Sequence, residues 1–235
     1  MRKAIWAAAV AVGAHAGPAL TTVPPLRARL APGLSGVGRR THVALTFDDG
    51  PDPDYTPAVL DRLDTLGVRA TFFLLGTQAA KHPALARDLA AAGHEIGLHG
   101  YEHRSLLSRG PCATHRDLTR GREVIEDLTG MPIRWWRPPY GILTGAGIVA
   151  AQRLRLTPVL WTAWGRDWTA SATAESVLAT VRRGLRPGGT VLLHDSDCTS
   201  APGSSAATVA ALPQLVREVR GRGLDIGTLR EHMNG

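Results

Sequence analysis

Lysine is nearly absent from this 235-residue chain. Only Lys3 and Lys81 occur, so arginine supplies almost all of the positive charge behind the formal net charge of +7. The arginines are scattered rather than gathered in one run, and aromatic residues make up only 5% of the chain. This pattern argues against a basic arm or a stacking platform for nucleic acid. A basic surface would still suit an anionic matrix such as a bacterial cell wall.

Cysteine and long apolar stretches are scarce as well. Two cysteines, Cys112 and Cys198, are too few for a disulfide framework, and neither belongs to a CxxC pair. They form either one bridge, if the protein is exported, or two unrelated thiols. No stretch approaches the ~18 apolar residues of a membrane-spanning helix, so we expect no integral membrane span.

The amino terminus has the three-part form of a secretory signal peptide. Arg2 and Lys3 precede a small apolar stretch, 4–14, and residues 14–16 (AHA) offer an A-x-A cleavage site. We therefore predict a signal peptide over 1–16. The alternative is an alanine-rich start on an internal protein.

The rest of the chain has an ordinary globular composition. Hydrophobic residues make up 44% and charged residues 20% of it, and its length suits one sizeable core. Residues 17–40 are rich in Pro, Gly and Arg without periodicity, and we predict a linker there. The folded domain is accordingly expected at 41–235.

From His42 onward the chain alternates between two kinds of segment. Short apolar runs rich in β-branched and aromatic residues predict strands at 42–47, 70–75, 94–99, 133–137, 157–162, 189–194 and 225–229. Apolar residues three and four apart predict helices at 56–66, 82–92, 115–129, 144–155, 173–185 and 205–221, the first three ending at Gly67, Gly93 and Gly130. Strand-then-helix order means parallel strands joined by helical crossovers. About seven such units predict an α/β fold with a closed or nearly closed barrel.

Polar residues gather where the predicted strands end. They are Asp48 and Asp49 after the first strand, His99 and His103 after the third, Arg137 and Tyr140 after the fourth, Asp167 after the fifth, and His194 with Asp195 after the sixth. In barrels of this kind the chemistry lies at the carboxyl ends of the strands. We therefore predict one active site on one face.

Two of these groups have the residue types of a metal site. Asp48 and Asp49 are neighbouring carboxylates that should point in different directions, so one can bind a metal while the other stays free; turn or cap aspartates are the alternative. His99 and His103 are four apart, a spacing that in a helical turn puts both imidazoles on one face. Two histidines and one carboxylate leave positions open on a divalent ion, as a catalytic site requires.

Five segments in order resemble the motifs of the polysaccharide deacetylase family (carbohydrate esterase family 4, with its NodB-like domain). They are 46–50 (TFDDG), 99–103 (HGYEH), 137–141 (RPPYG), 164–168 (WGRDW) and 192–195 (LLHD). The resemblance covers nearly the whole folded part. It implies a distorted, incomplete (β/α) barrel of about seven parallel strands.

The resemblance also implies how a metal would be held and used. Asp49, His99 and His103 match the family's metal ligands, usually for zinc, with cobalt, nickel or manganese as alternatives. Asp48 matches the general base that takes a proton from a metal-activated water. Arg137 matches the arginine that keeps this base ionised and oriented.

The leaving group and the acyl group have matching residues too. His194 matches the general acid that protonates the departing amine, and Asp167 matches the partner that steadies its imidazole. The backbone N–H of Tyr140 matches a donor to the oxyanion. Trp168 and Leu192 match the apolar pocket for the acetyl methyl group.

Two positions depart from the family pattern. Gly100 stands where the family usually has Ser or Thr after its first histidine, which removes a hydroxyl but no ligand. Trp164 stands where the fourth motif usually begins with aspartate, and Gly165 follows it. With Gly100 we still expect metal binding. With Trp164 the contacts to the substrate are in question.

The expected activity is removal of N-acetyl groups from an N-acetylglucosamine-containing polysaccharide, of peptidoglycan or chitin type. The alternatives are an O-acetyl xylan ester or a small amide on the same site, and a glycan-binding module without catalysis. We expect a poly- or oligosaccharide substrate, a monomer, and a secreted or cell-wall location in a bacterium, with a cytoplasmic location as the alternative.

Overall fold

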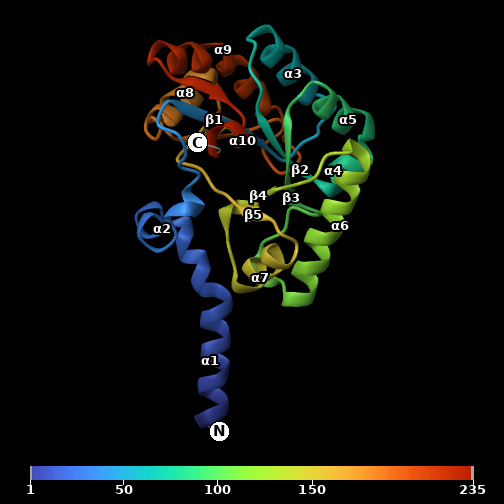
Figure 1. Ribbon diagram of the computed structural model, residues 1–235, viewed down its shortest axis with the longest axis vertical. Coiled ribbons are helices and arrows are strands. Elements are labelled where there is room, and N and C mark those ends of the chain that lie inside the picture. Colours follow the sequence, from blue (N-terminus) through green and yellow to red (C-terminus); the bar gives the residue numbers. More distant parts are fainter. Residues whose placement is uncertain (1, 234–235) are drawn as a thin grey trace.

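The computed structural model describes residues 2–233, with the side chains of all these except 3–5, 7 and 8. Parallel strands form a curled sheet with helices packed around its outside (Figure 1). The strands are β1 (His42–Asp48), β2 (Thr71–Leu75), β3 (Glu95–Gly100), β4 (Trp135–Trp136), β5 (Thr157–Pro158), β6 (Ala163–Trp164), β7 (Thr190–His194) and β8 (Asp225–Gly227). The predicted distorted, incomplete (β/α) barrel is confirmed, with eight strands in place of about seven.

The sheet is organised around β1. Its strand order is β5-β4-β3-β2-β1-β7-β6, and β8 pairs with the first half of β1, opposite 42–44. The second half of β1 pairs with β2 on one side and β7 on the other. The strand that ends in the two aspartates therefore lies in the middle of the barrel wall.

The two edges of the sheet are joined by a very short stretch of chain. β5 and β6 lie at opposite ends of the strand order but are separated only by residues 159–162. The five Cα–Cα steps from Pro158 to Ala163 reach at most about 18 Å, so the sheet must curl until its two edges lie close together. The prediction of one strand over 157–162 is thus wrong. β5 covers the first two of these residues, the chain then crosses to the opposite edge of the sheet, and β6 begins at Ala163.

The helices largely occupy the predicted segments. They are α3 (Thr56–Thr65), α4 (Gly76–Lys81), α5 (Pro83–Ala91), α6 (Pro111–Thr129), α7 (Gly145–Arg153), α8 (Ala174–Arg182), α9 (Ser205–Gly221) and α10 (Leu229–Met233), with short 3-10 turns η3 (Leu106–Ser108) and η4 (Pro139–Gly141). Gly67, Gly93 and Gly130 have φ of +60°, +79° and +66°, the left-handed conformation expected just after a helix. α4 and α10 are additional to the prediction.

The alternation of side chains along the strands divides the core in two. On β1, Val43, Leu45 and Phe47 face outward into the large core beneath the helices, and the Phe47 ring stacks on Phe72 at 4.9 Å. Ala44 instead joins a small cluster inside the barrel, with Phe73, Trp135, Val159 and Leu229. Because Leu229 comes from α10, this helix fills the end of the barrel opposite to the end where β1 reaches Asp48.

The amino-terminal segment contains more regular structure than a linker requires. Residues 17–40 hold η1 (Gly17–Thr22), α2 (Pro24–Leu30) and η2 (Pro32–Ser35). Arg27 is buried, and its guanidinium donates to the carbonyls of Thr21 (3.1 Å) and Trp161 (2.8 Å). This segment therefore packs onto the part of the chain that closes the barrel.

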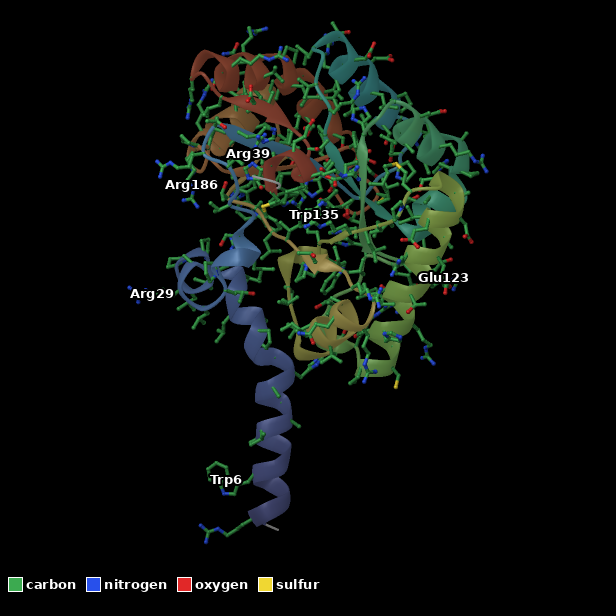
Figure 2. The ribbon with its side chains drawn as sticks, viewed as in Figure 1. Trp6, Arg29, Arg39, Glu123, Trp135 and Arg186 are labelled. Carbon is green, nitrogen blue, oxygen red and sulfur yellow. The ribbon has the colours of Figure 1, made fainter. Side chains whose placement is uncertain are left out.

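Helix α1 (Arg2–Ala16) extends away from the rest of the molecule (Figure 1). Its exposed Trp6 points into solvent (Figure 2), and its last turn lies against the body, with the carbonyl oxygen of Ala14 close to Gly145. The side chain of Lys3, part of the predicted signal peptide, lies outside the described residues. Among residues 2–233 no helix is long and apolar enough to cross a membrane.

Acid should destabilise this fold through His94, whose Nδ1 accepts from the N–H of Ala70 at 3.2 Å. Burial lowers its pKa from 6.5 to about 4. Above ~6.5 the histidine is neutral in both states; as pH falls from ~6.5 to ~4 the unfolded state takes up the proton first, so stability is lost. We expect urea unfolding of metal-free protein to show a loss of roughly 2–3 kcal/mol from this group.

The variant His94→Gln should lose correspondingly less stability over the same pH range. Thr65→Gln, at an exposed position at the end of α3, is the control, because it introduces the same side chain without removing a titratable group and should keep the wild-type pH dependence. If the unfolding free energy of His94→Gln depends on pH in the same way as that of wild type, His94 is not the source of the acid destabilisation.

Candidate active site

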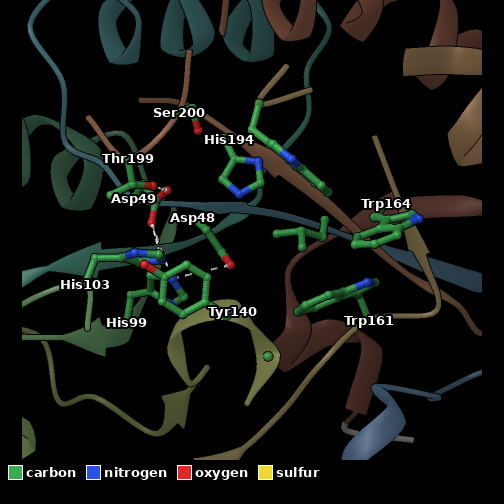
Figure 3. A pocket seen from close by; sticks show the side chains of 13 residues that line it. Asp48, Asp49, His99, His103, Tyr140, Trp161, Trp164, His194, Thr199 and Ser200 are labelled. Carbon is green, nitrogen blue, oxygen red and sulfur yellow. Dashed lines mark hydrogen bonds and ion pairs between the residues drawn. The ribbon is translucent and has the colours of Figure 1, made fainter. Parts of the chain in front are cut away.

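A cavity of about 260 Å³ opens at the carboxyl ends of the strands. Its lining residues are Asp48, Asp49, His99, His103, Tyr140, Gly141, Trp161, Trp164, Trp168, Leu192, His194, Thr199 and Ser200 (Figure 3). Eight of the ten residues predicted for the site are among them. The other two, Arg137 and Asp167, are fully buried and lie behind Asp48 and His194 respectively.

Asp48 is held by a buried ion pair. The Nη1 of Arg137 donates to Asp48 Oδ1 at 2.7 Å and to the hydroxyl of Thr46 at 2.8 Å. Its other nitrogens donate to the carbonyls of Val159 and Leu160, at 3.3 and 3.2 Å. All three guanidinium nitrogens are thus engaged, and Asp48 keeps Oδ2 on the cavity side, 3.9 Å from His99 Nε2.

Asp49, His99 and His103 converge on one point. Their potential ligand atoms all lie within 4.8 Å of one another. Asp49 Oδ1 is 3.3 Å from His99 Nε2 and 3.6 Å from His103 Nε2. The predicted metal ligands are therefore together in space, although they come from two different strand ends.

Two details of this cluster differ from the prediction. His99 lies in β3, at a point where the pairing with β2 shifts register, and His103 lies in the following loop, so a strand end and a loop bring the two imidazoles together without a helical turn. A register irregularity of this kind re-aims a side chain beside an active site. Asp49 has φ of +79°, which turns it back toward His99, so both carboxylates face the same imidazole rather than diverging.

The hydrogen bonds of the cluster fit a bound cation. The Nδ1 of His99 lies 2.8 Å from the carbonyl oxygen of Arg137, which can only accept, so in the neutral ring Nε2 carries a lone pair. This lone pair faces Asp49 Oδ1, a buried oxygen with no hydrogen-bond partner among the described residues. Two acceptors that face one another at this distance share a positive charge, either a proton on His99 or a cation in its place, and a carboxylate with two imidazoles is a donor set for zinc and similar ions.

The pKa shifts in the cluster also fit a site that attracts a cation. Burial opposes ionisation of Asp49, yet His99, His194 and His103 lower its pKa well below the usual range. Burial likewise works against protonation of His99, but the carboxylates of Asp48 and Asp49 raise its pKa. The pKa of His103 is lowered to about 4, chiefly by burial. The site thus holds Asp49 ionised and attracts positive charge.

The loop that carries His103 is fixed from α6. The carboxylate of Asp117 accepts from the N–H groups of Tyr101 (3.1 Å) and Glu102 (3.3 Å). Gly100 has φ of +125°, and a Cβ there would lie 3.1 Å from Asp117 Oδ2. The glycine that departs from the family pattern is therefore required by this backbone conformation, and Asp117 supplies loop hydrogen bonds.

His194 and Asp167 form a second couple across the cavity. His194 Nδ1 lies 2.9 Å from Asp167 Oδ1, while Asp167 Oδ2 accepts from the His194 N–H at 2.7 Å and from the Thr208 hydroxyl at 2.5 Å. Burial opposes the charge on His194, but Asp167 outweighs it and raises the pKa to about 10. The imidazole is therefore protonated at neutral pH, with Nε2–H free to act as a donor.

Tryptophans form one wall of the cavity. Trp168 contacts the His194 ring edge-on at 5.7 Å, Trp164 lies 5.1 Å from Trp168, and Trp161 stacks beside Trp164 at 6.0 Å. Leu192 completes this wall. The departure at Trp164 thus extends an apolar surface outward from the predicted acetyl pocket, toward a rim where Trp164 is 39% exposed.

Three residues that line the cavity are not predicted from the sequence. Trp161 belongs to an apolar run and has the signal of a core residue, while Thr199 and Ser200 lie in a loop without periodicity or motif. Tyr140, which the sequence does predict, has φ of +59°, and its ring meets that of His103 edge-on at 4.5 Å. Both cysteines are free thiols, so the single-bridge alternative does not hold here.

Comparison with known proteins places the chain in a family. Residues 35–159 match the family model described as polysaccharide deacetylase. A chitooligosaccharide deacetylase of Bradyrhizobium sp. is 37% identical over 195 residues, which cover 80% of this chain and 88% of that protein. The chain belongs to the polysaccharide deacetylase family and is a hydrolase of that class.

Solved structures agree with this assignment and show that the fold alone does not guarantee activity. A peptidoglycan N-acetylglucosamine deacetylase is 31% identical and superposes with a TM-score of 0.78 over 85% of this chain and 92% of that one. A pseudoenzyme of carbohydrate esterase family 4 from Bacillus anthracis is 26% identical, with a TM-score of 0.74 over 82% of this chain and 65% of that one. Catalytic activity in this fold therefore depends on which site residues a chain carries.

The Asp48–Arg137 pair generates a stability prediction. Replacing Arg137 with Met leaves a buried carboxylate without its cation, so we expect a loss of about 3–5 kcal/mol in the unfolding free energy of metal-free protein. Arg87→Met, an exposed position on α5, is the matched control and should cost under ~1 kcal/mol.

A double variant separates loss of the pair from loss of packing. Arg137→Met combined with Asp48→Asn should be less destabilised than Arg137→Met alone, because the uncompensated charge is gone. Additive losses in the double variant would show that the ion pair contributes nothing of its own.

Proposed function

We propose that this protein removes N-acetyl groups from an N-acetylglucosamine-containing polysaccharide of peptidoglycan or chitin type. One observation carries the proposal: a candidate metal cluster lies in one cavity between an arginine-bound carboxylate and a carboxylate-bound, protonated histidine. Metal ligation, a base and an acid are the parts that hydrolysis of an unactivated amide requires. The relatives named above act on glycans that carry this amide.

The proposed metal site is Asp49, His99 and His103, with zinc as the expected ion and cobalt, nickel or manganese as alternatives. A divalent ion held there supplies Lewis acidity, which polarises a carbonyl and lowers the pKa of water. Asp48 accepts the proton of the attacking water on its Oδ2, the oxygen that Arg137 does not bind. Arg137 pairs with the other oxygen of that carboxylate and fixes its direction.

His194 acts as the general acid on the other side of the substrate. Its raised pKa keeps a proton on the imidazole, and its Nδ1 bond to Asp167 directs the remaining N–H into the cavity. The amine leaves as a neutral group because this proton reaches the nitrogen as the C–N bond breaks. The backbone N–H of Tyr140 donates to the oxyanion, and Trp168 with Leu192 receives the methyl group.

The alternative functions would all use this same cavity. An O-acetyl xylan ester or a small amide would use the same base, acid and ligands, so the contacts around the cavity mouth would decide between them. A glycan-binding module without catalysis would be expected to have lost part of the set, whereas Asp48, Asp49, His99, His103 and His194 are all present and oriented toward one cavity. We therefore favour an active deacetylase.

The location and organisation of the chain belong to the proposal as well. We propose that 1–16 is a signal peptide, that 17–40 is a connecting segment, and that 41–235 is the catalytic domain of a monomer that is secreted or attached to the bacterial cell wall. Support comes from α1, which extends away from the rest of the molecule and lies against it at its last turn.

Asp48→Asn tests the reaction. We expect zinc-reconstituted wild type to release acetate from N-acetylglucosamine oligomers or peptidoglycan, and the variant to lose about 10²–10⁴-fold in kcat, because an amide cannot accept the proton. Asp54→Asn, exposed in the loop after β1, is the control.

Zinc content should be measured in all three proteins, so that loss of the base is separated from loss of the metal. Undiminished acetate release by Asp48→Asn would overturn its assignment as base. If wild type holds zinc yet releases no acetate from either glycan, the substrate is an O-acetyl ester or a small amide instead.

Trp164→Ala tests the substrate contact at the cavity rim. Removal of an aromatic side chain from a binding surface costs about 0.5–1.5 kcal/mol, so we expect KM for oligosaccharides to rise ~3–10-fold with kcat nearly unchanged. Trp164→Phe should retain most of the affinity, and Trp6→Ala, on α1, should change nothing. A fall in kcat at constant KM would place Trp164 in the acyl pocket rather than at a sugar contact.

A further inference from the structure

The two oxygens of the Asp49 carboxylate have different surroundings. Oδ1 faces His99 and His103 and has no hydrogen-bond partner among the described residues. Oδ2 accepts a hydrogen bond from the hydroxyl of Thr199 at 2.5 Å. One carboxylate oxygen thus faces the proposed metal position, and the other binds one hydroxyl group.

Thr199 comes from a loop that is itself well anchored. The loop runs from β7 to α9, and the Ser196 hydroxyl donates to the Asp52 carboxylate at 3.0 Å while accepting from the Cys198 N–H at 3.1 Å. On the other side of Thr199, the Ala201 N–H donates to the carbonyl of Trp168 at 3.0 Å. Thr199 is therefore held at a fixed position over Asp49 even though its own side chain lies near the surface.

We propose that Thr199 is a positioning residue for the metal site, which holds Asp49 with Oδ1 alone directed at the ion. This inference rests on the metal site of the proposed function, but concerns a residue outside the family motifs. Asp49 has φ of +79° and leads directly into the Gly50-Pro51 turn. Its backbone fixes where the side chain starts, and the hydrogen bond to Oδ2 fixes how the carboxylate group is rotated.

The consequence is a contribution to metal affinity. Outer partners that orient a ligand typically change affinity by 10–100-fold when they are removed. Without the hydroxyl, the carboxylate can rotate away from the two imidazoles or toward solvent, and the ion must then restore its orientation at a cost in binding free energy.

The test is zinc affinity, measured by competition with a chromophoric chelator on the full chain without substrate. Thr199→Val keeps the shape of the side chain and removes the hydroxyl, and we expect zinc to bind at least ~10-fold more weakly. Thr199→Ser restores the hydroxyl and should remain within ~3-fold of wild type. Ser200→Ala, the next residue and also in the cavity lining, is the matched control and should leave zinc affinity unchanged.

The outcomes separate this inference from the proposed reaction. Zinc affinity of Thr199→Val that equals or exceeds that of wild type would overturn the role of Thr199, as would equal weakening in Thr199→Ser. Wild type that binds zinc but deacetylates no glycan would overturn the proposed reaction, while the affinity series would still decide on Thr199. Failure of wild type to bind zinc, cobalt or nickel would overturn both.

Discussion

The guanidinium of Arg137 lies inside the barrel with no exposed surface, and the arrangement of the site depends on it. It stacks on the Phe73 ring, with the guanidinium carbon 4.1 Å from the ring centroid, and binds Asp48 and Thr46. The carbonyl of the same residue accepts from His99 Nδ1. A buried charge is costly unless every donor is satisfied and a counter-ion is present. One residue therefore fixes the proposed base through its side chain and a proposed metal ligand through its backbone.

Much of the fold follows from local pattern, and the exceptions occur where closure of the barrel decides the structure. β1, β2, β3 and β7 have alternating or continuous apolar sequences that are strand-like on their own, and the glycines after three helices predict their ends. The run 157–162 has the same apolar character, but it must cross between the two edges of a curled sheet, so it breaks into β5 and β6. α4 is too short for a periodic signal. Such features depend on contacts between distant segments, which no local window contains.

The site shows the same division between local and distant causes. The convergence of Asp48, His99 and His194 was predictable because parallel strands bring their carboxyl ends to one face. The directions of the side chains were not, since they depend on the positive φ of Asp49 and the register shift near His99. Thr199 gives no sequence signal at all, because a single threonine in an irregular loop gains its role only from where the loop is anchored.

His99 and His194 have opposite proposed roles in the same cavity. Each imidazole uses Nδ1 for a buried partner and presents Nε2 to the cavity. For His99 that partner is a carbonyl oxygen, which fixes Nδ1 as the donor and leaves Nε2 facing Asp49, the side from which the carboxylates attract either a proton or a cation. For His194 it is the ionised carboxylate of Asp167, which stabilises the imidazolium, so Nε2 presents a proton. The group that each Nδ1 contacts, rather than the imidazole itself, thus distinguishes the proposed ligand from the proposed acid.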